Sequence, residues 1–137
     1  MLKKIISLVL PLIVLWSCNS KKEERPLTAL DTGRAFIRAS LDGDFKTTEE
    51  LLLKDTPNIQ QFELYKRLYE RMSPETKQHY KSASYTVNKY LDLDDSTTII
   101  NYSNSYMNKP MEIKVVKKDK AWFIDFKYIS SGNLPID

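Results

Sequence analysis

The side chain with the most distinctive chemistry in this 137-residue chain is its single cysteine, Cys18. A cysteine thiolate is a strong nucleophile and can form a thioether with a lipid, so an unpaired cysteine is a candidate lipidation site. It follows two early basic residues, Lys3 and Lys4, and an apolar run over residues 5–16 that only Ser7 interrupts. A basic segment followed by an apolar one is typical of a secretory signal peptide. The sequence therefore predicts export, with Cys18 at the expected cleavage point.

The apolar run is too short to serve as a membrane-spanning helix. Twelve helical residues rise about 18 Å, whereas the hydrocarbon core of a bilayer is about 30 Å thick. Pro11 lies within the run and disfavours a straight helix. We therefore expect this segment to be removed rather than retained as an anchor.

The four residues Leu15-Trp16-Ser17-Cys18 resemble the lipobox of bacterial lipoproteins, in which leucine stands three residues before the cysteine and a small residue precedes it. Leu15, Ser17 and Cys18 match, whereas Trp16 is bulkier than usual. The resemblance implies that residues 1–17 are cleaved and that Cys18 is acylated. The alternative is a plain signal peptide with a leftover cysteine, but a free exported thiol without a partner would be a liability. Two or three acyl chains would anchor the protein stably in a membrane.

Residues 18–27 are polar and without periodicity, which predicts a flexible tether. No Asp follows Cys18 directly, and Lys22-Glu23-Glu24 resembles the export signal of certain surface lipoproteins of Gram-negative bacteria. The predicted location is therefore the cell envelope of a Gram-negative bacterium, anchored by lipid in the outer membrane. The periplasmic and the surface-facing orientation both stay open at this point.

The charge balance gives no indication of nucleic-acid binding. Removing residues 1–17 takes away two lysines and no acid, which leaves 19 basic and 18 acidic side chains and a formal net charge of +1. Nucleic-acid binders present concentrated basic surfaces, which this composition does not suggest. The remaining length suits one domain with one core, which we place at residues 28–130, followed by a C-terminal tail at residues 131–137.

The helices are expected first in the chain. Helical spacing predicts one from about Thr28 to Leu41, in which Gly33 permits close packing of a neighbouring element and after which Gly43 ends the helix. A short helix then starts near a capping residue, Asp44, and reaches Lys54. A third helix, which we expect Thr56 to cap, carries its apolar face at Ile59, Phe62, Tyr65, Leu68, Tyr69 and Met72. One more helical turn is expected to reach about Tyr80.

From Ser82 onward the apolar period changes from 3.6 to 2, which predicts strands. Four are expected: around Tyr85–Leu91, Thr97–Met107, Met111–Lys117 and Ala121–Ile129. In the last strand, Trp122, Ile124, Phe126 and Tyr128 should face the core and Asp125 should point outward. Helices followed by a four-stranded meander give an α+β fold.

Few residues suggest catalysis or metal binding. His79 is the only histidine and is expected in an exposed loop, so no usual zinc site is predicted. Three acids, Asp92, Asp94 and Asp95, fall at a hairpin tip, where solvated carboxylates are common. We predict no catalytic residue, no metal and no cofactor. Strand tyrosines are expected to serve mainly in packing, with recognition as the alternative. The lysines at positions 114, 117, 118 and 120 are expected to protect a sheet edge.

Two segments resemble nuclear transport factor 2-like domains, and most closely a lipoprotein branch of uncharacterised function. They are the stretch over residues 35–45, AFIRASLDGDF, and the Lys-Asp-Lys-Ala-Trp hairpin at residues 118–122. The resemblance covers residues 28–129. It implies N-terminal helices packed on a curved four-stranded antiparallel sheet, forming a cone whose mouth can bind small molecules or partners.

Three functions follow as hypotheses. The first is a lipid-anchored envelope protein with a small non-catalytic binding domain, whose partner is an envelope protein, a glycan or a small molecule. The second is a hydrolase or isomerase of the cone type, which some members of the superfamily are. The third is a structural or inhibitory protein that acts through its sheet surface. A buried carboxylate beside a tyrosine in an open pocket would favour the enzyme.

Overall fold

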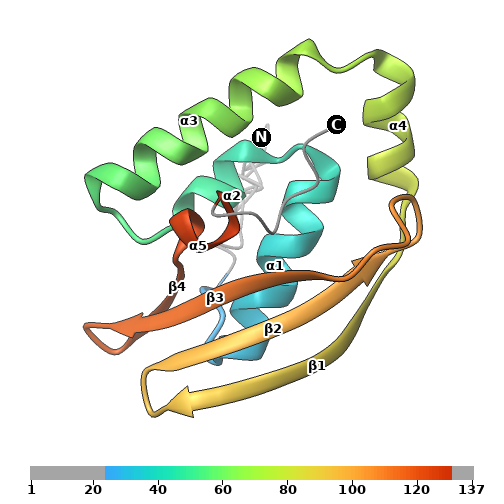
Figure 1. Cartoon of the computed structure of the whole chain (residues 1–137). Coiled ribbons are helices and arrows are strands. Elements are labelled where there is room, and N and C mark those ends of the chain that lie inside the picture. The colour runs from blue at the N-terminus through green and yellow to red at the C-terminus, as the bar shows by residue number, and fades with distance from the viewer. Residues whose placement is uncertain (1–23, 131–137) are drawn as a thin grey trace, which may run out of the picture.

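The computed structural model describes residues 24–130 and shows an α+β fold, as the sequence predicted. The helices are α1 (Ala29–Asp42), α2 (Phe45–Glu50), α3 (Thr56–Arg71), α4 (Pro74–Ser82) and α5 (Phe126–Ser130). The strands are β1 (Tyr85–Asp94), β2 (Thr97–Asn104), β3 (Met111–Lys118) and β4 (Ala121–Ile124). The sheet curves along α1, and α3 and α4 form an arch at one end of the molecule (Figure 1).

Short polar side chains begin the helices, as their sequences suggest. The side chains of Thr28, Asp44 and Ser73 accept hydrogen bonds from backbone amides of α1, α2 and α4 respectively. Asp55 caps α3, so the expectation that Thr56 would do so is wrong, since Thr56 is already the first residue of that helix. Gly43 ends α1 with a φ of 69°, a left-handed conformation that costs glycine little.

The four strands form one antiparallel sheet in the order β1-β2-β3-β4. In the register, Ile100 of β2 lies opposite Ile113 of β3, and both are fully buried beneath α1. The helix can lie this close because position 33 is glycine, and a Cβ there would overlap the Ile100 side chain. The close approach expected of Gly33 is thus confirmed.

The two edges of the sheet differ. Along β4, the backbone of Ile124 exchanges hydrogen bonds of 2.8 and 2.9 Å with Leu51 and Leu53, so this edge is covered. Along β1, the large side chains of Tyr90 and Leu91 are more than half exposed. Of the lysines expected to protect a sheet edge, Lys114, Lys117 and Lys118 lie on the inner strand β3, and Lys120 lies in the turn that leads into the edge strand β4.

The segment expected to be a fourth long strand divides into β4 and α5. The residues from Trp122 to Tyr128 alternate with period 2, but Phe126 and Ile129 also stand three positions apart, as on one face of a helix. Both are buried on α5. Asp125, expected to point outward, is buried at the junction, where its carboxylate lies 3.0 Å from the ammonium of Lys127. The pair with Lys127 offsets part of the cost of removing this carboxylate from water.

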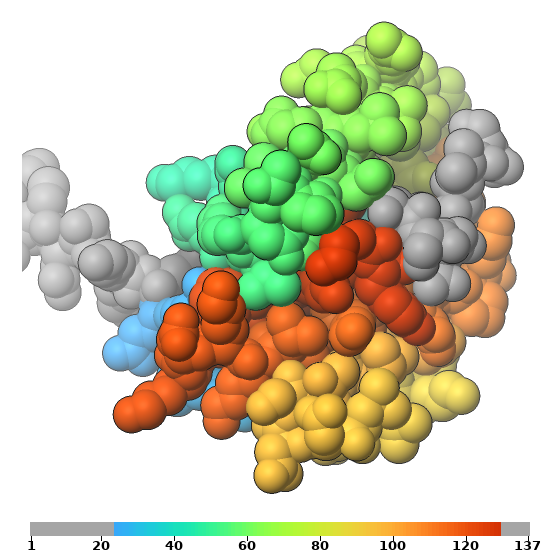
Figure 2. Space-filling model, turned by 60° about the vertical axis from the view of Figure 1, so that its left-hand side comes forward, coloured from blue at the N-terminus to red at the C-terminus, as the bar shows by residue number. Residues whose placement is uncertain are grey.

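Asn58 fixes the position of α5 against α3. Its side-chain oxygen accepts a 2.8 Å hydrogen bond from the backbone amide of Lys127, and Asp55 accepts bonds from both its backbone and its side-chain nitrogen. Asn58 is fully buried. Figure 2 shows α5 (red) between α3 (green) and the strands β2 and β3 (gold and orange). This placement makes α5 one wall of the cavity described next.

Candidate functional site

A cavity of about 450 Å³ lies between the helices and the inner face of the sheet. Its volume is within the range of small-molecule sites. Helix α1 contributes Phe36, Ile37, Ser40 and Leu41, and helix α3 with its C-cap residue contributes Tyr65, Leu68, Tyr69, Arg71 and Met72. The remaining wall comes from Tyr80, Tyr102, Asn104, Met107, Met111, Phe126 and Ile129. The lining is therefore mostly aromatic and aliphatic, with a few polar groups.

Edge-to-face aromatic contacts hold the wall on the α3 side. The ring of Phe126 lies 5.5 Å from that of Phe62 at 82°, and 5.7 Å from that of Tyr65. Phe45 meets Tyr69 at 4.9 Å and 90°. Such pairs add stability beyond the area that they bury. These contacts set the directions of the tyrosine rings that reach the cavity.

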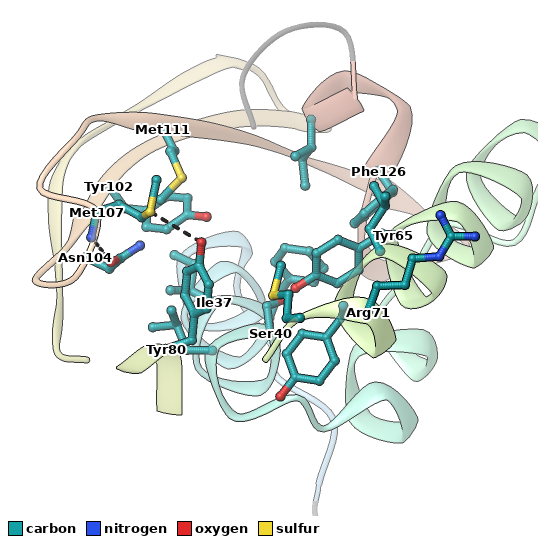
Figure 3. A pocket seen from close by; sticks show the side chains of 16 residues that line it. Ile37, Ser40, Tyr65, Arg71, Tyr80, Tyr102, Asn104, Met107, Met111 and Phe126 are labelled. Carbon is teal, nitrogen blue, oxygen red and sulfur yellow. Dashed lines mark hydrogen bonds between the residues drawn. The ribbon is translucent and has the colours of Figure 1, made fainter. Parts of the chain in front are cut away.

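Two tyrosine hydroxyls face the cavity from opposite sides, Tyr102 from β2 and Tyr65 from α3 (Figure 3). Within residues 24–130, neither hydroxyl has a protein hydrogen-bond partner. Burial raises the pKa of Tyr65 well above its ordinary value of 10.0, and the nearby hydroxyls of Tyr102, Tyr69 and Tyr80 raise it further. Burial, followed by the effect of Tyr80, likewise raises the pKa of Tyr102. Both hydroxyls are therefore neutral at physiological pH.

Asn104 is the most deeply buried polar side chain at the cavity, with 3% of its surface exposed. Its Oδ1 accepts hydrogen bonds from the backbone amides of Tyr106 and Met107, at 3.0 and 2.8 Å. Its backbone carbonyl accepts a bond of 2.9 Å from the amide of Asn108, which closes the turn after β2. The oxygen side of this amide is therefore occupied by the turn, and the nitrogen side is directed toward the cavity (Figure 3).

Helix α4 covers one side of the cavity through Tyr80, although it has no buried residue of its own. The Tyr80 hydroxyl donates to the sulfur of Met107 at 3.3 Å, and its ring meets Tyr106 edge-to-face at 4.9 Å. Arg38 of α1 donates to the carbonyls of Ala83 and Lys81 at the end of α4. These contacts attach α4 to both α1 and the turn after β2.

Two residues considered for chemistry lie away from the cavity. His79 is on α4 rather than in a loop, stacked on Tyr106 at 5.0 Å, with Glu75 3.6 Å from its Nε2. Asp125 pairs with Lys127 and, at 3.8 Å, with Lys114. Both side chains are thus accounted for by local contacts, and neither lines the cavity.

The three hairpin acids, Asp92, Asp94 and Asp95, line a separate open groove beside Trp122 and the start of α1. Asp92 accepts a hydrogen bond from the Thr98 hydroxyl at 2.6 Å, and Asp94 accepts one from the amide of Ser96. These bonds stabilise the strands and the turn. No group of three or more His, Cys, Asp or Glu residues in the described part of the chain could hold a metal ion.

Cys18 lies outside the described residues, as do the signal segment and most of the tether. Between residues 24 and 130, none of the helices combines the length and the apolar character that crossing a bilayer requires. The sequence reasoning did not single out Asn104 or Ser40. A signal for Asn104 was available, because it continues the inward-facing set Ile100 and Tyr102 and is therefore a polar residue at a core position of a strand.

Comparisons with protein-family models, curated proteins and solved structures found no match for this chain. Function is therefore inferred from the geometry of the cavity.

Proposed function

We propose that this protein is a lipid-anchored envelope protein whose domain, of the nuclear transport factor 2-like type, binds a small molecule without transforming it. The observation that carries the proposal is the cavity of about 450 Å³ with its mostly apolar lining. Cores of natural proteins are close-packed, and a space this large beside hydroxyls that have no partner among residues 24–130 is more typical of a binding site than of a packing defect. Acylation at Cys18 would keep the binding domain at a membrane.

The position of the cavity suits a tethered binding domain. Helix α1 begins at Ala29, next to the tether, and its later residues Phe36 to Leu41 line the cavity. Twelve helical steps from Ala29 to Leu41 rise about 18 Å. The chain first contacts the domain at Arg25, which donates to the carbonyls of Glu50 and Trp122, and it enters α1 at the end of that helix remote from the cavity (Figure 1). Attachment through this tether would leave the cavity accessible to a ligand.

The alternative of a cone-type hydrolase or isomerase receives no support from the cavity. General acid or base catalysis requires a positioned titrating group such as Asp, Glu or His. Among residues 24–130, none of these residue types lines the cavity. Its two unpartnered tyrosine hydroxyls have raised pKa values, which makes them poor bases at neutral pH. The geometry therefore favours binding over the hydrolase or isomerase.

The proposal can be tested on lipidated protein isolated from cell envelopes. We expect solvent extraction to release a small molecule in stoichiometric amount from the wild type. Ser40→Phe would place a ring in the cavity, so this variant should carry none. Ser84→Phe is a matched control on the exposed segment before β1 and should retain the molecule. Recovery of the same molecule from Ser40→Phe, or of none from the wild type, would contradict the proposal.

A further inference from the structure

We propose that the ligand is an apolar molecule that carries a carbonyl or carboxylate oxygen, and that the side-chain amide of Asn104 binds this oxygen. The inference rests on the proposed function, because it names the chemistry of the molecule that the same cavity would take. It follows from the hydrogen-bonding capacity that the fold leaves unused there.

The orientation of the Asn104 amide is fixed by the protein. Its Oδ1 accepts from two backbone amides, those of Tyr106 and Met107, and an amide nitrogen could not accept either bond. The Nδ2 group must therefore lie on the other side. No residue between 24 and 130 accepts a hydrogen bond from it. A side chain that is 97% buried thus presents a donor to the cavity.

The Nδ2 group is accessible at the cavity surface, so a ligand that covers this donor without accepting its hydrogen bond incurs a cost on the order of 1–3 kcal/mol. A ligand oxygen that accepted from Asn104 would remove this cost, whereas a ligand with only donors at that end would not. Figure 3 shows the Tyr102 hydroxyl on the same side of the cavity as Asn104. A hydroxyl can donate as well as accept, so Tyr102 can provide a second hydrogen bond to the same oxygen.

The rest of the lining agrees with an acceptor and disfavours a cation. The Ser40 hydroxyl is buried, has no hydrogen-bond partner in the part of the chain that the structure describes, and can donate. Arg71, the charged residue of the lining, is exposed at the end of α3 and forms no ion pair within residues 24–130. No carboxylate among the described residues lines the cavity. An ammonium group would therefore meet no compensating charge there, whereas a carboxylate would gain from Arg71.

The test uses the full chain in lipid nanodiscs with 3-fluorotyrosine in place of tyrosine, and the fluorine signals of Tyr65 and Tyr102 report occupancy of the cavity. Four naphthalene probes share one apolar body and differ at position 2: 2-acetylnaphthalene, 2-naphthoate, 2-ethylnaphthalene and 2-naphthylmethylamine. We expect the ketone and the carboxylate to bind about tenfold or more tightly than the hydrocarbon and the amine. Each apparent affinity is corrected for partition into empty nanodiscs.

Asn104→Asp separates recognition from folding. The new carboxylate can still accept hydrogen bonds from the amides of Tyr106 and Met107, but the Nδ2 donor is lost. We expect its affinity for the ketone and the carboxylate to fall about tenfold or more and its affinity for the amine to rise. Asn108→Asp makes the same change at an exposed turn position that already has a positive φ, and it should leave all four affinities unchanged. Arg71→Gln should weaken binding of the carboxylate and leave that of the ketone as it was.

The outcomes distinguish the two proposals. If no probe moves either tyrosine signal, small-molecule binding in the cavity is contradicted, and this inference with it. If all four probes bind alike, or Asn104→Asp preserves the order of the wild type, the cavity binds ligands but the assignment of an oxygen acceptor to Asn104 is wrong. Equal effects of Arg71→Gln on ketone and carboxylate would assign the carbonyl, rather than the carboxylate, as the recognised group.

Discussion

The guanidinium of Arg38 donates from Nη1 to the carbonyl of Ala83 at 2.8 Å, across 45 positions of sequence. Nη2 of the same group donates to the Lys81 carbonyl at 3.1 Å, and the Asp42 carboxylate accepts from both Nε and Nη2. A single side chain thus joins the C-terminal half of α1 to the last turn of α4. Because Tyr80 of α4 lines the cavity, this contact also keeps the cavity covered.

Replacing Arg38 should loosen α4. Arg38→Met retains an apolar stem but leaves two carbonyls at the helix end without their donor, so we expect a loss of about 1–2 kcal/mol. Amide hydrogen exchange should accelerate in α4 more than in α1. Arg34→Met is the control, since among residues 24–130 Arg34 makes only an exposed 3.8 Å pair with Asp31, and this variant should change stability by less than about 0.5 kcal/mol. Uniform acceleration over the domain would contradict a local role for Arg38.

Gly33→Ala should destabilise the protein although alanine favours helices. The added Cβ would overlap the side chain of Ile100 and press on Ile113. Overpacking costs about 1–3 kcal/mol, which exceeds the gain of about 1 kcal/mol in helix propensity. We expect a net loss in urea denaturation, whereas Arg34→Ala on the exposed side of α1 should be nearly neutral. A Gly33→Ala protein as stable as the wild type would show that the sheet can move away from α1.

Asn58→Ala should separate α5 from α3. It leaves the partly buried backbone amide of Lys127 without its acceptor, at a cost of about 1–3 kcal/mol. The near-ultraviolet circular dichroism of the aromatic wall should change as well, because Phe126 lies on α5. Asn88→Ala, at an exposed position of β1, is the comparison and should have a smaller effect. If the two variants lose equal stability, Asn58 does not have the role assigned to it.

Stability should fall at alkaline pH. The folded protein raises the pKa of Tyr65 and Tyr102 above their ordinary value of 10.0, so above pH 10 the unfolded chain loses protons that the folded chain keeps. The free energy of unfolding then decreases with rising pH, by about 1.4 kcal/mol per pH unit for each tyrosine. Tyr102→Phe should flatten this decrease, and Ser40→Ala, which removes a non-titrating cavity hydroxyl, should not. Parallel curves for Tyr102→Phe and the wild type would contradict the assignment.

Lipidation at Cys18 predicts that cells fed radiolabelled palmitate label the wild type and not Cys18→Ala. Ser17→Ala keeps a small residue before the cysteine and should be labelled normally. Label in Cys18→Ala would place the acyl group elsewhere. Protease added to intact cells would then distinguish the two orientations. A surface-facing domain would be cut, whereas a periplasmic domain would be protected.

The sequence determined the parts of this protein that depend on neighbours along the chain. Helix caps such as Asp44 and Ser73, the glycine that ends α1, and the change of apolar period at the first strand follow from local backbone and side-chain preferences, which act over a few residues. The interpretation of Leu15 to Cys18 as a lipidation signal also depends only on neighbouring residues, and it stays a prediction. Local pattern alone could not predict where the last strand ends. Residues 122–128 fit the period 2 of a strand, and Phe126 with Ile129 also fits the i, i+3 spacing of a helix.

Only the tertiary structure determined that residues 126–130 form a helix and which residues line the cavity. Asn58, 69 positions away, accepts from the amide of Lys127 and so turns the chain into α5. Asn104 became a cavity residue because the turn after β2 takes its oxygen and leaves its nitrogen to the interior. The free-energy cost of burying a polar group depends on its hydrogen-bond partners. These partners come from distant parts of the chain, so no local sequence pattern specifies them.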